Sequence, residues 1–546
     1  HKLTKRNIRT NIMKTFIGIA FTFFLLAVQS IRADDNHQAG IFNDETLGEA
    51  TFHVSCTPPA QKLFNQALAM LHSFWYDEAE KTFRYVTTVD KDCAMGHWGV
   101  AMSLYRQLWA TPPTPEELQK GRDALQRAKQ LMTKTDRERA YLEATGYLYP
   151  DDEMIDYGTR KLAYQKAMEQ LLVHNPDDSE ATIFYALALI STASPKDKTY
   201  SNQKRALNLL QEVLQKEPGH PGVAHYIIHG SDYPELARFG LKAAREYAQI
   251  APAVPHALHM PSHIFIRLGK WQEAVHSNLA AYHAAKRYAK KNAQMAVWDQ
   301  QMHFMDYLIY AYLQTGQTEK AEEILREVQA IKKAHPENTT SAYAFAAIPA
   351  RYAVERGNWH EAARLNIDPA DFPWKKFGWC EAITHFARGL GAARIGKIDE
   401  ARSILHQIEA LRDSDKTANK HYTADQIEIQ RLAVAAWIAY GEGETKKAEK
   451  LMRASAELED ATEKDNVTPG AIKPARELLG ELLLELKKPQ EALEEFETSL
   501  TQTPNRRNGI YGAAQAAKLT GDEQKAHHYE RQLQELITTD EIHSIE

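Results

Sequence analysis

The chain has 546 residues, of which 44% are hydrophobic and 25% charged, a composition typical of folded proteins. This length exceeds that of a usual domain with a single hydrophobic core, so several domains or an extended repeat array are expected. The formal net charge of −6, without a basic stripe, argues against nucleic acid as a partner.

The N-terminal region is typical of an export signal. From Met13, the segment MKTFIGIAFTFFLLAVQSIRA has a basic residue, an apolar run at Phe16–Val28 and small residues before position 34. A membrane anchor is the alternative, but the run is shorter than the roughly 20 residues that span a bilayer. We expect 1–33 to be upstream residues plus a cleaved signal, 34–55 to be a lead-in, and the protein to be periplasmic or secreted without a transmembrane segment.

The chain has three cysteines, Cys56, Cys93 and Cys380. In an exported protein, Cys56 and Cys93 can form a disulfide that ties the N-terminal helices together and leaves Cys380 unpaired. Two independent buried thiols are the alternative.

A repeated pattern runs through the rest of the chain. Each unit has a helix, a turn with glycine, and a second helix with alanine five residues after that glycine. In all of them except the unit with Ile309, a small residue seven positions before the glycine allows two helices to approach closely. The glycine–alanine pairs are Gly269/Ala274, Gly316/Ala321, Gly357/Ala362, Gly396/Ala401, Gly443/Ala448 and Gly521/Ala526.

These units, among them RLGKWQEAV, QTGQTEKAEEIL and ERGNWHEAARL, resemble the tetratricopeptide repeat family. Segments such as HYIIHGSDYP and HALHMPSHIF are also similar to signatures of uncharacterised exported bacterial members of that family. The resemblance implies an all-α, right-handed superhelical solenoid of helix-turn-helix repeats. We divide it into N-terminal repeats (56–216), central repeats with a histidine-rich groove (217–365) and C-terminal repeats (366–546).

Histidines concentrate in the central repeats. Residues 217–283 hold eight of the 23 histidines. His225 and His229 are four apart, and His256, His259 and His263 are spaced by three and four. These intervals place side chains on one face of a helix, where imidazoles can share zinc, copper or iron.

The family resemblance adds a register. It implies that residues 13, 10 and 6 before each turn glycine face the concave groove, as His256, His259 and His263 do before Gly269. Asp232 and Asp306 are candidate oxygen ligands, and Pro261 bends the helix between two of the histidines. The remaining groove or supporting residues by this register are His229, Tyr226, His303, Tyr310 and Arg351.

Three functions are compatible with this pattern. The first is a binding protein whose concave groove holds a protein, peptide or small-molecule ligand at a metal-loaded histidine centre. The second is a metalloenzyme, a hydrolase or oxidoreductase, with Asp232, Asp306 or Tyr310 moving protons. The third is a protein–protein scaffold in which the histidines only hydrogen-bond between helices. No HExxH, GxSxG, phosphate-binding loop or haem-attachment motif occurs to decide among them.

Overall fold

A computed structural model describes residues 46–106, 112–131, 133–152, 154–291 and 295–542. The expected signal peptide lies outside these residues. The described chain is a right-handed solenoid of helical hairpins, each with an inner and an outer helix. The N-terminal hairpins are α2 (Pro58–His72) with α3 (Tyr76–Val89), α4 (Ala94–Tyr105) with α5 (Pro115–Gln130), α6 (Asp136–Gly146) with α7 (Tyr157–His174), and α8 (Ser179–Thr192) with α9 (Ser201–Lys216).

The central and C-terminal parts continue the same arrangement. The central hairpins are α10 (Pro221–Ser231) with α11 (Ala237–Ile250), α12 and α13 (Pro255–His259, Pro261–Arg267) with α14 (Trp271–Lys291), α15 (Asp299–Thr315) with α16 (Thr318–Ala330), and α17 (Thr339–Glu355) with the short α18 (Trp359–Ala362). The C-terminal hairpins are α19 (Gly378–Arg394) with α20 (Ile398–Thr417), α21 (His421–Gly441) with α22 (Thr445–Asp460), α23 (Ala475–Glu485) with α24 (Pro489–Gln502), and α25 (Arg507–Thr520) with α26 (Glu523–Ile542).

The turns between paired helices follow the predicted pattern. All six turn glycines have a positive φ, from 64° at Gly357 to 80° at Gly316. This left-handed conformation ends a helix and costs glycine little because it has no Cβ. Lys487 takes the same conformation, with φ 60°, at the turn that lacks glycine. One two-residue parallel pairing, β1 (Val297–Trp298) with β2 (Ala334–His335), and the 3-10 turn Trp374–Lys376 are the additions to the helical pattern.

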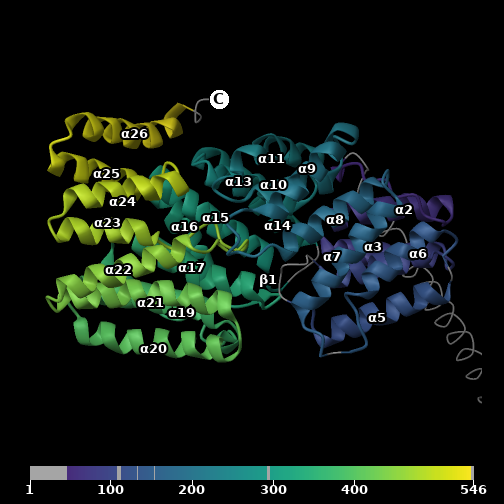
Figure 1. Cartoon of the computed structure of the whole chain (residues 1–546), viewed down its shortest axis with the longest axis horizontal. Coiled ribbons are helices and arrows are strands. Elements are labelled where there is room, and N and C mark those ends of the chain that lie inside the picture. The colour runs from purple at the N-terminus through teal and green to yellow at the C-terminus, as the bar shows by residue number, and fades with distance from the viewer. Residues whose placement is uncertain (1–45, 107–111, 132, 153, 292–294, 543–546) are drawn as a thin grey trace, which may run out of the picture.

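The inner helices of the C-terminal half close into a ring. In Figure 1 the hairpins α19 to α26 stack at the left, α2 to α8 lie at the right, and α10 to α15 lie between them. Inner helices α15, α17, α19, α21, α23 and α25 contact one another in succession, and α25 returns to contact α15. Trp271 Nε1 donates to Asn505 O (2.7 Å), and Asn505 Nδ2 donates to Gly269 O (3.2 Å) across this closure.

Residues 462–473, between α22 and α23, lie in the middle of this ring; we refer to them as the central segment. Tyr343 Oη donates to Thr468 Oγ1 (2.7 Å), and the Arg351 guanidinium donates to the carbonyls of Gly470 and Ala471 (3.3 and 2.8 Å). Lys198 Nζ contacts Glu463 at 2.6 Å. The inner surface that the sequence predicted to be a concave groove is therefore partly occupied by the chain itself, and a cavity of about 340 Å³ remains beside the central segment.

The lead-in fills the inner side of the N-terminal half in a similar way. Phe52 is fully buried against Phe64, Trp98 and Tyr141. Cys56 and Cys93 are joined by a disulfide, and Cys380 is a free, buried thiol.

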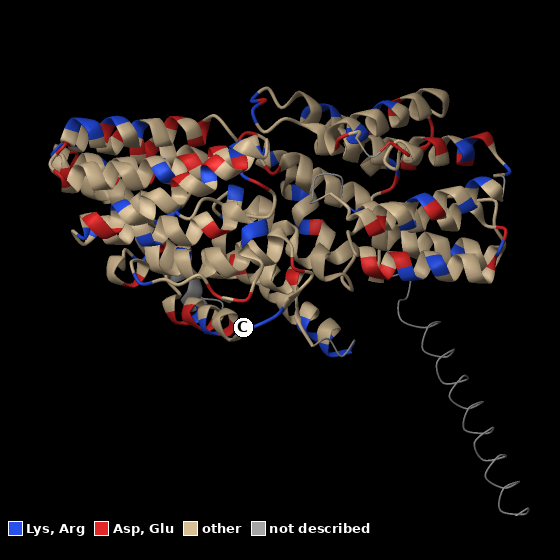
Figure 2. Ribbon diagram, turned by 90° about the horizontal axis from the view of Figure 1, so that it is seen from below, with Lys and Arg blue, Asp and Glu red and all other residues tan. Residues whose placement is uncertain are grey.

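Charge is mixed over the outer surface. Figure 2 shows lysine and arginine alternating with aspartate and glutamate along the same outer helices. Among the described residues, no helix combines the length and apolar character needed to cross a membrane.

Candidate metal centre

Six histidines meet where α10, α12, α13 and α15 pack together. Helix α10 begins with Pro221, and the His220 imidazole caps it by accepting from the backbone N–H of Gly222 (3.1 Å). This fixes the helix so that His225 and His229, one turn apart, face the interior. Five of the six imidazoles are buried, and His256 is partly exposed.

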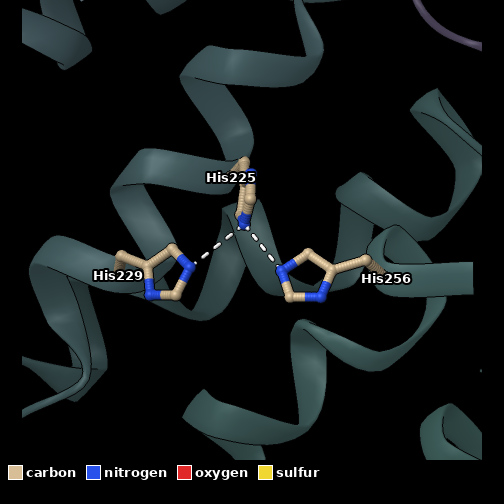
Figure 3. A group of neighbouring side chains, drawn as sticks. All are labelled: His225, His229 and His256. Atoms are coloured by element: carbon tan, nitrogen blue, oxygen red, sulfur yellow. Dashed lines mark hydrogen bonds between the residues drawn. The ribbon is translucent and has the colours of Figure 1, made fainter. Parts of the chain in front are cut away.

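The first triad is His225, His229 and His256. Figure 3 shows the Nε2 atoms of His229 and His256 both directed at Nε2 of His225, at 3.1 and 3.2 Å. The three ligand atoms all lie within 4.8 Å of one another. Adjacent imidazole nitrogens on one tetrahedral or octahedral ion, with bonds of roughly 2.0–2.1 Å, lie roughly 2.8–3.4 Å apart. The two pairs that include His225 have this spacing, while the Nε2 atoms of His229 and His256 both face His225 from separate helices.

The tautomer of His225 is set by its neighbour. Its Nδ1 lies 2.6 Å from the carbonyl oxygen of His72, which can only accept, so Nδ1 carries the proton and Nε2 presents a lone pair. A single in-plane lone pair cannot accept well from both His229 and His256. A cation among the three nitrogens satisfies all of them at once.

The second triad is His259, His263 and His303. His259 Nδ1 donates to Asn278 Oδ1 (2.6 Å), while Asn278 Nδ2 is engaged with Ala274 O, which fixes the amide orientation. His263 Nδ1 donates to Asp232 Oδ2 (2.9 Å). Both Nε2 atoms are therefore unprotonated in the neutral rings, yet they lie 3.1 Å apart.

Two lone pairs facing each other at 3.1 Å repel unless a positive species lies between them. The outer nitrogens of His259 and His263 are held by an amide and a carboxylate. Such outer hydrogen bonds orient metal-binding imidazoles and select the tautomer that presents Nε2 to the ion. The Nε2 atoms that face each other fit the ligands of a transition metal. The hydrogen bonds that hold the Nδ1 atoms of the same rings fit the support that such ligands have.

Pro261 separates α12 from α13 and stands at the start of α13. Proline at a helix start is tolerated because the first N–H has no partner within the helix. The break changes the direction of the His263 side chain relative to that of His259. The Nε2 atoms of the two rings nevertheless lie 3.1 Å apart. The bend assembles the second triad and does not disrupt it.

Asp232 connects the second triad to the central segment. Besides His263, its carboxylate accepts from Arg267 Nε (2.8 Å) and from Lys464 Nζ (2.7 Å). Burial alone would raise the pKa of Asp232, but Lys464, Arg267 and His263 together hold it well below its ordinary value. Asp232 is therefore a fixed anion that orients His263, and it is not a ligand of either triad.

The imidazoles of the centre are neutral near pH 7. Burial lowers the pKa of every one below the ordinary histidine value, and burial with the neighbouring His263 lowers the pKa of His256 to about 3. Neutral imidazole is the form that binds metal. The others are His225, His229, His259, His263 and His303.

A third group nearby is satisfied without an ion. Glu180 Oε2 accepts from His72 Nε2 (2.8 Å), and Glu180 Oε1 accepts from His220 Nε2 (3.0 Å). The Nδ1 of His72 accepts from Tyr226 Oη (3.0 Å). Each nitrogen and carboxylate oxygen has a complementary partner, so this group is a hydrogen-bond network that holds α2, α8 and α10 together.

The five histidines predicted as ligands all lie in the two triads. His303, predicted only as a groove residue, completes the second one. Tyr226 belongs to the neighbouring network through its bond to His72.

Asp306, Tyr310 and Arg351 lie elsewhere. Asp306 Oδ1 faces Arg351 Nε (3.3 Å), and Tyr310 Oη accepts from Arg506 (2.8 Å). Asp306 lies outside both triads, and its Oδ1 pairs with Arg351.

Several residues of the site were not predicted from the sequence. His72 supports His225 through its backbone carbonyl, 153 positions away, and Phe74 lies against His225, with ring centroids 4.3 Å apart. Phe74 reaches this position from a turn in which its φ is 56°. Asn278 and Lys464 act through contacts between elements. A repeat register carries no signal for such contacts.

Comparisons with known proteins support the repeat assignment. Residues 446–507, which span most of α22, α23 and α24, match the model of a tetratricopeptide repeat family. No curated protein matches this sequence.

Solved structures give weak overall likenesses. A structure of the human IFIT1 dimer with m7Gppp-AAAA has 13% identity over 91% of this chain and 96% of its own, with a TM-score of 0.32. Yeast Tom70 has 11% identity over 85% and 96%, with a TM-score of 0.32. The Cut9–Hcn1 hetero-tetramer of APC/C has 13% identity over 87% of each chain, with a TM-score of 0.29.

Proposed function

We propose that this chain is a transition-metal-binding protein in which a tetratricopeptide-like scaffold holds ions in buried histidine triads. The observation that carries the proposal is the pair His259 and His263. Their outer nitrogens donate to Asn278 and Asp232, and their two Nε2 lone pairs face each other at 3.1 Å. An ion between them removes the repulsion, and His303 supplies a third nitrogen.

Binding is favoured over catalysis by the state of Asp232. A metal-dependent hydrolase needs an acid or base that exchanges protons near the open position on the metal. Asp232 is the carboxylate that touches the second triad, but Arg267 and Lys464 keep it charged and occupied.

The helical repeats that hold the triads could also bind partner proteins or peptides. Tetratricopeptide repeats are interaction modules, and the outer surface of mixed charge is available to proteins or peptides. We also propose that the chain works outside the cytoplasm, periplasmic or secreted. The Cys56–Cys93 disulfide supports an oxidising compartment.

Metal analysis of the full-length protein tests the proposal. The purified chain is loaded separately with zinc, copper and iron, desalted and measured by mass spectrometry. Retention of at least one ion per chain is expected, with loss from the second triad in a His259→Ala/His263→Ala variant. A His527→Ala/His528→Ala variant is the matched control, since both imidazoles are exposed on α26. A wild-type chain that retains none of the three metals overturns the proposal.

A further inference from the structure

The two triads lie against each other. Ring centroids of His229 and His263 are 5.8 Å apart, and those of His256 and His259 are 5.9 Å apart. Within the first triad the corresponding distances run from 4.8 Å (His225–His229) to 6.4 Å (His229–His256). The nearest histidines of the two triads are thus as close to each other as histidines of one triad are.

The same short elements build both triads. Helix α12 gives His256 to the first and His259 to the second, one turn apart. Helix α10 faces α13 and brings His229 beside His263. Two ions held by these triads would therefore share one compartment, with no helix between them.

The charges of the side chains around the two triads restrict which metal ions they can hold. All six donors are neutral imidazoles, and the nearby carboxylate Asp232 is already matched by Arg267 and Lys464. Two divalent ions would bring four positive charges into a buried site whose neighbouring carboxylate, Asp232, is already paired, which is costly. Two conditions relieve this cost: ions that also exist in a +1 state, or a small oxygen anion held between the two ions.

Copper meets the first condition. It is among the ions that imidazole suits, stands highest in the divalent affinity series, and has a stable monovalent state. Phe74 lies over the first triad, with its ring centroid 4.3 Å from that of His225 and 5.6 Å from that of His256. The Phe74 ring thus places an apolar surface over one side of the first triad, whose His256 is partly exposed.

Resting on the proposed metal-binding function, we infer that the six histidines form one paired copper centre, with one ion per triad and, in the cupric form, a hydroxide bridging the two. Each ion takes three nitrogens from the protein, and the bridging hydroxide lowers the added charge of the cupric pair from four to three.

Copper stoichiometry and electron paramagnetic resonance of the full chain test this inference. After loading with cupric sulfate and desalting, two coppers per chain are expected, with most of the cupric signal lost because the bridge couples the two spins. A His225→Ala/His229→Ala variant should keep one copper and regain the signal of one full spin per chain. Its circular dichroism spectrum, compared with wild type, shows whether it is folded.

The remaining outcomes separate the two proposals. One copper per chain with a full signal in the wild type overturns the pair and leaves metal binding intact. Two coppers with two full spins overturn the bridge and the shared compartment. Retention of zinc or iron without copper overturns the copper centre alone. Failure to retain any of the metals removes the proposed function as well.

Discussion

Replacing Asp232 by asparagine tests the support of the second triad without changing the size of the side chain. The carboxylate accepts from His263 (2.9 Å), Arg267 (2.8 Å) and Lys464 (2.7 Å), and its own side chain is 1% exposed. An amide has one acceptor oxygen, and its NH₂ would face donors. The variant therefore loses the fixed orientation of His263 and leaves two cations without their anion.

The magnitudes follow from these contacts. Loss of an outer carboxylate typically weakens a metal site about 10- to 100-fold, which is about 1.4–2.7 kcal/mol of binding free energy. Leaving a buried charge unpaired costs about 3–5 kcal/mol of folding free energy. Competition with a chromophoric chelator measures the first quantity, and urea unfolding measures the second.

Asp306→Asn is the matched control. Asp306 is an equally buried carboxylate that pairs with Arg351 and lies outside both triads. Its replacement should lower stability and leave metal affinity within about twofold. The reasoning is refuted if a folded Asp232→Asn protein keeps wild-type metal affinity, or if the Asp306 variant loses affinity to the same extent.

Three further predictions concern stability. Arg506→Met should cost about 3–5 kcal/mol in urea unfolding, because it strands two buried carboxylates that the guanidinium now binds. Burial raises the pKa of Asp299 to about 6, so the folded chain holds its proton more tightly than the unfolded chain and stability falls as pH rises from about 4 to 6. The stability gain from Asp299→Asn should therefore grow by about 2 kcal/mol between pH 4.5 and 7.5, and a constant difference contradicts this account. Replacing Cys56 and Cys93 by serine should cost about 4 kcal/mol, since the disulfide closes a span of 37 residues, and an unchanged thermal midpoint would count against it.

The fold could be predicted from the sequence periodicity because each hairpin repeats the same local pattern of residues. The turn glycines, from Gly269 to Gly521, take the left-handed conformation that their position predicted. The register also placed His256, His259 and His263 on the inner surface. These features depend on neighbours within one or two helical turns, which a sequence displays directly.

The support of the site could not be predicted in this way. The contact of His225 with the His72 carbonyl spans 153 positions, and that of Asp232 with Lys464 spans 232. The division into two triads depends on the break at Pro261 and on which neighbouring helix each ring meets. Such contacts arise from how hairpins pack in three dimensions, and no spacing in the sequence records them.

The central segment also sets an order of events during synthesis. All six histidines precede it in the chain, and about 160 residues separate His303 from Lys464, or about 8 to 32 s of translation at typical rates. Through that interval the inner helices can pack while Asp232 still lacks its lysine partner and the ring has not closed. The second triad therefore reaches its final charge arrangement only after the C-terminal third has been made and has folded into place.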